Sequence, residues 1–179
     1  MITLDKIGKR ICILGCSNSG KSTLADALSK KLNIPAYHLD QLAHIENSKW
    51  ERNSDEILIE KHNSIINQDT WIIDGNYSVC MNERLDLATS VIWLDPNVFS
   101  SVLRYLSRSF KNNPNRPGRL AGAKNEFRFW LIKWIVLNYP KNRKKYQKIL
   151  EGKPNLPVLH IGSMKQLKKY YDFWGIQVN

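Results

Sequence analysis

The sequence predicts an α/β fold, in which a five-stranded parallel sheet is covered by helices on both faces. Short apolar runs alternate with segments of helical periodicity along most of the chain, which is the pattern of β-α units. At 179 residues, with 42% hydrophobic and 24% charged residues, the chain has room for one domain with a sizeable core. We therefore expect a single three-layer α/β/α domain over residues 1–179.

Five short apolar runs are predicted strands, at residues 10–14, 34–40, 71–74, 90–95 and 157–161. Helices are expected between them. Leu24, Leu28 and Leu32 recur at helical spacing within 21–32, and Ser54 is a suitable N-cap for a helix over 54–68. Pro96 suits the first turn of a helix over 96–110, and a capped helix over 163–174 closes the chain.

One polar segment interrupts this alternation. Residues 111–125 are rich in Gly and Pro and predict a long inserted loop, followed by an aromatic helix near 127–139 and the basic run at 141–148. Residues 1–100 hold 10 Lys and Arg against 13 Asp and Glu, a net charge of −3, whereas residues 101–179 hold 17 against 3, a net charge of +14. This asymmetry predicts an anionic partner for the second half: a polyphosphate, a nucleic acid or an acidic membrane surface.

Cysteine content and the N-terminus limit the class of protein. The three cysteines, at positions 12, 16 and 80, form no zinc-type pair and are odd in number, so we expect free thiols in a reducing cytoplasm. The first residues, MITLDKIGKR, carry no apolar core or cleavage site, so we expect no signal peptide. The most apolar run, 127–139, is too short to span a bilayer.

One motif lies between the first expected strand and the first expected helix. Gly15-x-x-x-x-Gly20-Lys21-Ser22 fits the phosphate-loop pattern G-x-x-x-x-G-K-[ST]. Glycines let the backbone curl so that successive N–H groups point at phosphate oxygens, and the helix start adds its positive end. We expect Lys21 to reach the β- and γ-phosphates and the Ser22 hydroxyl to ligate Mg²⁺. The residues predicted to bind the phosphates of ATP or GTP are Gly15, Cys16, Ser17, Asn18, Ser19, Gly20, Lys21, Ser22 and Thr23.

Three acids follow expected strands, at the sheet edge where ligands bind in open α/β folds. A phosphate loop needs a second metal partner, and we expect it to be Asp74 in WIIDGNY. Asp40 in YHLD is expected to face the phosphoryl acceptor, either as a base or as a hydrogen-bond acceptor. Asp95 precedes Pro96 and is expected to cap the next helix, and His38 to be a packed strand residue.

Taken in order, the phosphate loop, IPAYHLDQL, WIIDGNYS, VIWLD and an arginine-bearing insertion resemble adenylate-kinase-like small P-loop kinases, and most closely the topology-modulation proteins among them. The resemblance covers nearly the whole chain. It implies a P-loop NTPase fold with a core sheet, an acceptor-binding region and an Arg-rich mobile lid over about residues 104–145. It also implies ATP and Mg²⁺ as cofactors and a small molecule as phosphoryl acceptor.

The resemblance also assigns roles around WIIDGNYS. It carries the metal role to Asp74, and it implies that Gly75 and Tyr77 line the acceptor side and that Arg84 touches an acceptor phosphate. The chain departs from adenylate kinases in two respects: no arginine closely follows its Asp-Gly step, and the long acceptor-binding helical region of those enzymes is short here.

Arginines of the insertion are expected to take part in catalysis. Arg104 and Arg108 lie four residues apart and so share one helix face, and they match the lid-helix arginines of related kinases best. Phosphoryl transfer spreads negative charge over the equatorial oxygens, which guanidinium groups stabilise well. Further arginines follow along the chain: Arg116, Arg119, Arg128 and, as a weaker match, Arg143.

Two functions from different classes remain open. The first is a Mg²⁺-dependent kinase that moves the γ-phosphoryl group of ATP to a nucleoside monophosphate, nucleoside, sugar or other small hydroxyl compound. The alternative is an ATP-regulated protein that binds DNA or RNA through its basic second half, with affinity that falls steeply as salt rises. A membrane-surface role is the weakest, because 127–137 lacks a clean polar face.

Overall fold

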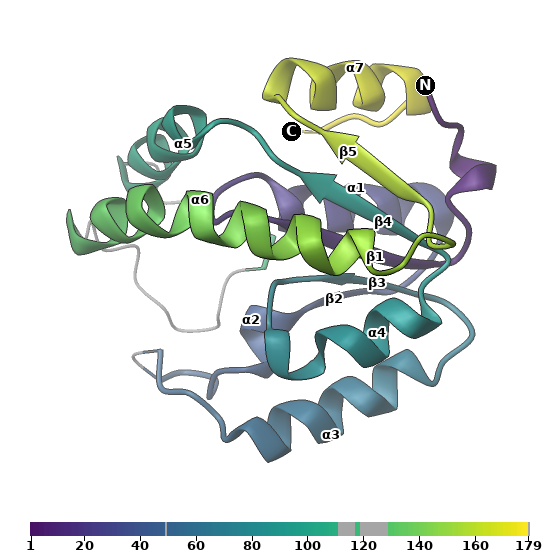
Figure 1. Ribbon diagram of the computed structural model, residues 1–179, viewed down its shortest axis with the longest axis horizontal. Coiled ribbons are helices and arrows are strands. Elements are labelled where there is room, and N and C mark those ends of the chain that lie inside the picture. The colour runs from purple at the N-terminus through teal and green to yellow at the C-terminus, as the bar shows by residue number, and fades with distance from the viewer. Residues whose placement is uncertain (49, 111–116, 119–128, 179) are drawn as a thin grey trace.

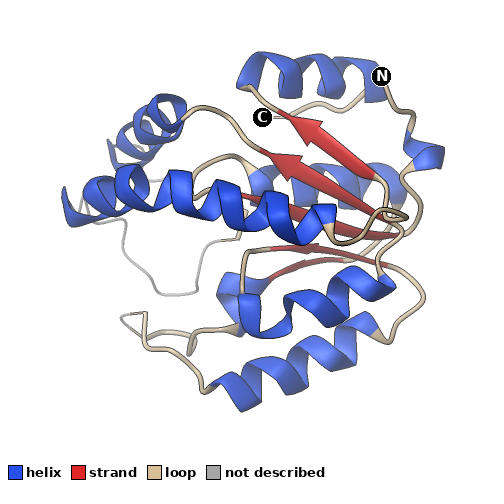
Figure 2. Cartoon of the chain, viewed as in Figure 1, coloured by secondary structure: helices blue, strands red, loops and turns tan. Residues whose placement is uncertain are grey.

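The core of the molecule is a parallel β-sheet with helices packed on both faces, as Figures 1 and 2 show for the computed structural model. The structure describes residues 1–48, 50–110, 117–118 and 129–178. In this part of the chain, five strands form one sheet: β1 (Arg10–Gly15), β2 (Ala36–His38), β3 (Trp71–Asp74), β4 (Ser90–Leu94) and β5 (Val158–Ile161). Their order is β2-β3-β1-β4-β5, and every pair is parallel. The predicted fold class is therefore confirmed.

Strand register brings the carboxyl ends of three strands together. In the central strand β1, Ile13 pairs with Asp74 of β3, and Gly15 pairs with Leu94 of β4. Because the strands are parallel, the loops that follow β1, β3 and β4 all leave the sheet at one edge, where ligands bind in such folds. The register therefore places the phosphate loop beside the WIIDGNY turn.

Two helices cover one face of the sheet, α1 (Lys21–Leu32) and α7 (Met164–Trp174). Leu24 and Leu28 of α1 and Leu167 and Trp174 of α7 are buried against strand residues such as Ile13. The opposite face is covered by α2 (Leu39–Leu42), α3 (Asp55–Ile66), α4 (Met81–Leu87) and α6 (Phe129–Glu151). Since both faces are covered, the central strands are mostly apolar between their end residues, as in other parallel sheets. Two 3₁₀ turns, η1 (Leu4–Lys6) and η2 (Ser78–Cys80), complete this part of the fold.

Side chains cap the helices in two of the three places expected from the sequence. The Ser54 hydroxyl accepts a hydrogen bond from the Ile57 N–H, and the Ser163 hydroxyl accepts one from the Gln166 N–H. The expectation that Asp95 caps the next helix is wrong. Helix α5 (Val98–Phe110) begins two residues later than expected, and the side chain of Asn97 accepts the Ser100 N–H at 2.8 Å instead.

Other boundaries differ from those expected. Strand β2 ends at His38, so Asp40 lies in the first turn of α2 instead of at a strand end. Helix α4 was not expected from the sequence. The aromatic helix and the basic run form one helix, α6, which continues through Pro140. A proline removes one backbone hydrogen bond from a helix, but Pro140 does not end α6. The inserted loop 111–125 lies outside the described residues except at 117–118.

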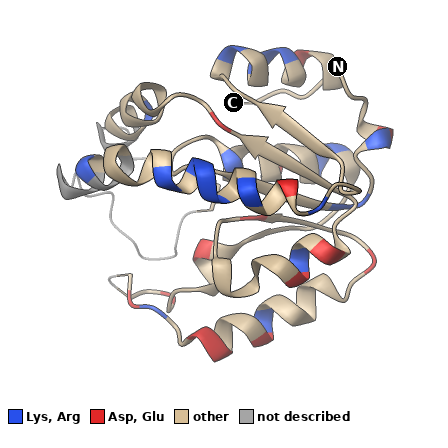
Figure 3. Ribbon diagram, viewed as in Figure 1, with Lys and Arg blue, Asp and Glu red and all other residues tan. Residues whose placement is uncertain are grey.

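Charge is distributed unevenly over the helices (Figure 3). The exposed side of α6 carries Lys141, Lys144, Lys145 and Lys148, and Figure 3 shows this basic stripe along the helix. In the described part of the chain, no helix is both long enough and apolar enough to cross a membrane.

Candidate functional site

The phosphate loop connects β1 to α1, and its backbone requires glycine at two places. Gly15 ends β1 with a φ of +148°, and a Cβ built there would lie 2.2 Å from the Leu94 carbonyl oxygen. Gly20 precedes α1 with a φ of +100°, a conformation that L side chains rarely adopt. The loop therefore curls close under β4 before the helix starts. It contains the residues predicted to bind phosphate, Gly15, Cys16, Ser17, Asn18, Ser19, Gly20, Lys21, Ser22 and Thr23, the last three in the first turn of α1.

The two residues predicted to hold Mg²⁺ are in direct contact. The Ser22 hydroxyl donates to Asp74 Oδ2 at 2.8 Å, and Asp74 is 4% exposed at the end of β3. A hydroxyl and a carboxylate are hard oxygen donors of the kind that Mg²⁺ prefers beside phosphates, so the pair fits such an ion. Lys21 lies over the same loop, where its Nζ donates to the Cys16 carbonyl oxygen at 2.9 Å. A phosphate in the loop would offer this ammonium group a stronger, charged partner.

Asn76 is a site residue that the sequence analysis missed. Its side-chain amide forms two hydrogen bonds with the backbone of Gly15: Oδ1 accepts the Gly15 N–H at 3.2 Å, and Nδ2 donates to the Gly15 carbonyl oxygen. The amide thus pairs with the first glycine of the phosphate loop as a neighbouring strand would. The signal was present in the sequence, since Asn76 is part of the DGNY segment that was singled out for Asp74, Gly75 and Tyr77.

His38 has polar partners that a packed strand residue does not need. Its ring lies between two carboxylates, with Nδ1 on Asp74 Oδ1 and Nε2 at 2.9 Å from Asp26 Oδ1 in α1. Burial disfavours the charged ring, but the hydrogen bonds and charges of Asp74 and Asp26 outweigh this effect and raise the pKa of His38. His38 is therefore hydrogen-bonded to Asp74, one of the two predicted metal ligands, as well as being a residue of β2.

The insertion reaches this network at Gly118. A Cβ built on Gly118 would lie 2.6 Å from Ser22 Oγ and 3.4 Å from His38 Nδ1, and the φ of Gly118 is +65°. The backbone at this position therefore rests directly on the Ser22 side chain. Only glycine allows so close an approach without a shift of the loop or of Ser22.

Asp40 and Tyr77 meet on the acceptor side of the sheet edge. The Tyr77 hydroxyl donates to Asp40 Oδ1 at 2.9 Å, and the Arg52 guanidinium carbon lies 5.9 Å from the centre of the Tyr77 ring. Gly75 adopts a φ of +130°, and a Cβ there would lie 2.7 Å from Leu39 Cβ. The structure thus brings together three predicted acceptor residues around the start of α2 and adds Arg52, which the sequence analysis did not single out.

Arg84 is placed differently from the expectation that it touches an acceptor phosphate. Its side chain is fully buried, and its Nη2 donates to the Gly75 carbonyl oxygen at 3.0 Å. The Nε and Nη1 atoms find no hydrogen-bond partner in the described part of the chain. A side chain with no exposed area cannot contact a ligand phosphate. In this structure Arg84 instead holds the Asp74–Gly75 turn through its hydrogen bond to the Gly75 carbonyl.

Arg104 is the insertion arginine that the structure places beside the phosphate loop. A Cβ built on Gly20 would lie 3.3 Å from Arg104 Nη2, and Arg104 Nη1 lies 3.5 Å from the sulfur of Met164. Burial lowers the pKa of Arg104, but arginine remains charged at neutral pH. Among the described residues no carboxylate pairs with it, and its guanidinium group lies beside Gly20 of the loop. Arg108 lies four residues later on α5, and its side chain is outside the described part, as are Arg116, Arg119 and Arg128.

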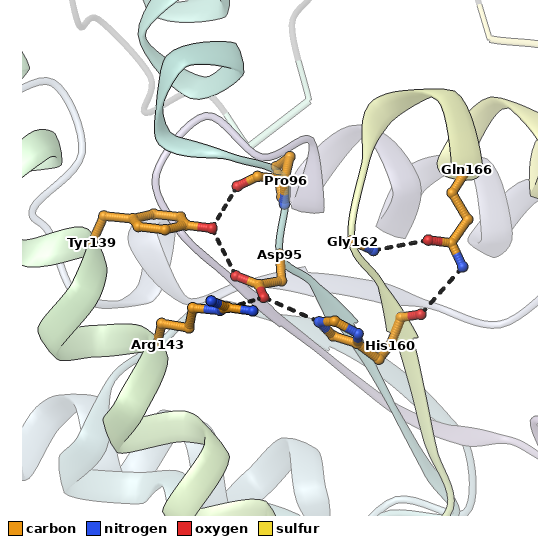
Figure 4. Close-up of polar contacts among 7 residues, drawn as sticks. All are labelled: Asp95, Pro96, Tyr139, Arg143, His160, Gly162 and Gln166. Carbon is orange, nitrogen blue, oxygen red and sulfur yellow. Dashed lines mark hydrogen bonds and ion pairs between the residues drawn. The ribbon is translucent and has the colours of Figure 1, made fainter.

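Arg143 pairs with a carboxylate of the protein itself. Its Nε donates to Asp95 Oδ2 at 2.8 Å, and His160 Nε2 lies 3.1 Å from the same oxygen. Figure 4 shows both side chains converging on Asp95. The Tyr139 hydroxyl lies 2.9 Å from Asp95 Oδ1 and 2.8 Å from the Pro96 carbonyl oxygen. The buried Asp95 carboxylate therefore fastens α6 to the ends of β4 and β5.

Comparisons with known proteins agree with the fold. No protein-family model matches the chain, and no curated protein matches it by sequence. A shikimate kinase from Aquifex aeolicus has a similar structure, with a TM-score of 0.54 and 18% identity over 93% of this chain and 96% of that chain. A shikimate kinase from Bacteroides thetaiotaomicron has a TM-score of 0.59 and 14% identity over 93% of this chain and 98% of that chain. At these identities the likeness shows the fold of small P-loop kinases, and the resemblance to topology-modulation proteins stays a prediction.

Proposed function

We propose that the protein is a Mg²⁺-dependent kinase that transfers the γ-phosphoryl group of ATP to a hydroxyl group of a small molecule. The contact between Ser22 and Asp74 is the observation that carries the proposal, because it joins the expected metal partners beside a loop shaped for phosphates. The kinase fold of the two comparison structures supports it. Nothing in the comparisons supports the alternative of a nucleic-acid-binding protein.

Each residue has a role in this proposal. Ser22 and Asp74 would hold Mg²⁺, which supplies charge neutralisation between the phosphates. Lys21 binds the β- and γ-phosphates, and Arg104, with Arg108 on the same helix face, stabilises the charge that develops on the transferred group. Asp40 accepts the proton, or a hydrogen bond, from the attacking hydroxyl. Positioning and electrostatics account for the catalysis, with no covalent intermediate on the protein.

The test is ADP release from Mg·ATP with a panel of nucleosides, nucleoside monophosphates, sugars and polyols. We expect at least one acceptor to stimulate turnover, and Lys21→Ala to lower the stimulated kcat/KM by roughly 100-fold or more because a charged phosphate contact is lost. Lys30→Ala removes an exposed lysine of the same helix and is the matched control, with activity within twofold of wild type. If no acceptor stimulates turnover while DNA binds in a salt-dependent manner, the kinase proposal is wrong.

A further inference from the structure

Residues 43–48 and 50–53 belong to a short antiparallel ribbon between α2 and α3, here called the acceptor flap. The Ile45 N–H donates to the Glu51 carbonyl and the Asn53 N–H to the Ala43 carbonyl, each at 2.9 Å. His44 and Arg52 face each other across the ribbon as a β-bridge. The flap thus holds Arg52 over the Tyr77 ring, next to the pair that Tyr77 forms with Asp40.

The polar atoms around Asp40 are mostly hydrogen-bond acceptors. Tyr77 uses its only proton on Asp40 Oδ1, which leaves its own oxygen lone pairs for another donor. Burial and the Asp40 carboxylate raise the pKa of Tyr77, so the phenol keeps that proton at neutral pH. In the described residues Asp40 Oδ2 receives no hydrogen bond. A ligand that binds here must therefore supply donors.

His44 adds a third acceptor close by. Its Nδ1 lies 2.8 Å from the backbone carbonyl oxygen of Asp40, and a carbonyl oxygen can only accept, so Nδ1 must carry the proton of this hydrogen bond. In the neutral ring, this contact places the proton on Nδ1 and leaves the lone pair on Nε2. The His44 ring is also held at its edge by Trp50, with 5.2 Å between ring centres, and Trp50 is 37% exposed on the flap. The flap therefore presents an aromatic surface next to acceptor atoms.

Among the described residues, positive charge on this side is scarce. In this part of the chain Arg52 is the cation beside Tyr77, and its Nη2 pairs with Asp55 Oδ1 at 3.0 Å. Arg84, the arginine expected to meet an acceptor phosphate, is fully buried beneath Gly75. Residues 39–56 hold five acids and two bases. A dianionic phosphate accepts hydrogen bonds but donates hardly any, so it would meet acceptor atoms and like charges here.

We infer that the phosphoryl acceptor is an uncharged polyhydroxyl compound, such as a sugar, nucleoside or polyol, and that the site discriminates against phosphomonoesters. Hydroxyl groups satisfy the site because each can donate, to Asp40 Oδ2, to Tyr77 Oη or to His44 Nε2. The Trp50 ring offers an apolar surface for the carbon skeleton. The inference rests on the proposed kinase function and narrows its acceptor class.

The test compares matched acceptors that differ by one phosphate. Adenosine and AMP, glucose and glucose 6-phosphate, and glycerol and glycerol 3-phosphate are each given with Mg·ATP, and phosphorylated product is identified by mass spectrometry alongside ADP release. We expect the phosphate-free member of the productive pair to have a kcat/KM at least tenfold higher. A preference for the phosphomonoester overturns this inference and leaves the kinase proposal standing. If Mg·ATP binds but no member of any pair is phosphorylated, the proposed function and the inference are both wrong.

Variants separate recognition from folding. Tyr77→Phe removes one acceptor oxygen, and we expect it to raise the KM for the hydroxyl acceptor about tenfold while the KM for ATP stays within twofold. Glu46→Gln removes an exposed acid of the same flap that contacts neither Tyr77 nor Asp40, and it is expected to leave both KM values unchanged. An unchanged acceptor KM in Tyr77→Phe, or an equal rise in Glu46→Gln, would overturn the assignment. Acceptor-independent ATP binding by each variant shows that it is folded.

Discussion

At the scale of single residues, Asn76 holds the first glycine of the phosphate loop. Its amide bonds both backbone groups of Gly15, and its neighbour Gly75 is held by the buried Arg84. The turn after β3 thus fixes Asp74, the proposed metal ligand, and the start of the loop together. Asn76 acts through the loop and is a positioning residue.

Asn76→Asp is predicted to weaken ATP binding. The carboxylate cannot donate to the Gly15 carbonyl oxygen, and it adds a negative charge near the phosphates, so we expect the Kd for Mg·ATP to rise roughly tenfold or more. Isothermal calorimetry measures the Kd directly. The control is Asn82→Asp, the same exchange at an exposed position of α4. Equal Kd values in the two variants would show that the Asn76 clamp is not needed.

His62 is predicted to make the stability of the protein depend on pH. Burial lowers the pKa of this fully buried ring below its usual 6.5. As pH falls below about 6.5, the unfolded chain therefore binds a proton that the folded chain does not, and the free energy of unfolding decreases. Above that pH, His62 is neutral in both states and contributes no pH dependence.

Urea unfolding of wild type and His62→Gln between pH 5 and 7.5 checks this prediction. We expect wild type to lose stability relative to the variant as the pH is lowered, with a slope of at most about 1.4 kcal/mol per pH unit. His38 titrates in both proteins and cancels in the difference. Parallel stability curves would mean that the folded protein accommodates the charged His62 ring.

At the scale of elements, Asp95 decides how α6 is attached to the sheet. Helix α6 returns from the insertion, and Tyr139 and Arg143 of α6 converge on the buried Asp95 carboxylate together with His160 of β5 (Figure 4). This junction lies close to the phosphate loop. Burial is the main cause that raises the pKa of the Cys16 thiol in the loop, and the nearby negative charge of Asp95 raises it further. The residue that attaches α6 to the sheet therefore lies near Cys16 of the phosphate loop.

Asp95→Ala is predicted to destabilise the protein by about 2 kcal/mol, because it removes the acceptor shared by three side chains and leaves the half-buried Tyr139 hydroxyl with the Pro96 carbonyl alone. Arg143→Ala removes the half-exposed partner of the same ion pair and is expected to cost less than about 1 kcal/mol. Guanidinium unfolding of both variants gives the two values. Similar losses would indicate that the Arg143 ion pair, and not the buried network, carries the stability.

At the scale of the whole molecule, binding of nucleotide is predicted to stabilise the fold by mass action. A ligand that binds only the folded state at 100 times its Kd adds about 2.7 kcal/mol to the free energy of unfolding. We expect Mg·ATP to produce this gain in wild type and in Lys30→Ala, and to produce little of it in Lys21→Ala at the same concentration. Thermal unfolding at several ATP concentrations measures the effect. An undiminished gain in Lys21→Ala would mean that the nucleotide binds elsewhere.

The local features of this protein could be predicted from its sequence. Apolar runs bounded by polar residues indicated all five strands, because a strand covered on both faces must be apolar, and Ser54 and Ser163 marked helix starts by a short-range hydrogen bond. The phosphate loop could also be predicted, because its glycine spacing reflects the backbone conformation within a single turn. The helix start near residue 96 was predicted wrongly because two nearby residues can cap a helix. Asp95 was expected to be the cap, but Asn97 caps the helix instead.

By itself, then, the sequence determined the α/β class and the position of the phosphate-loop motif, and it singled out Asp74, which the structure places against Ser22 of that loop. Only the tertiary structure decided that Asn76 clamps Gly15, that Arg84 is buried under Gly75, and that Asp95 joins three elements. These contacts link residues between nine and 65 positions apart in the chain. The physical reason is that helix and strand signals depend on neighbours within a few residues, whereas burial and side-chain pairing depend on how the strands align in the sheet.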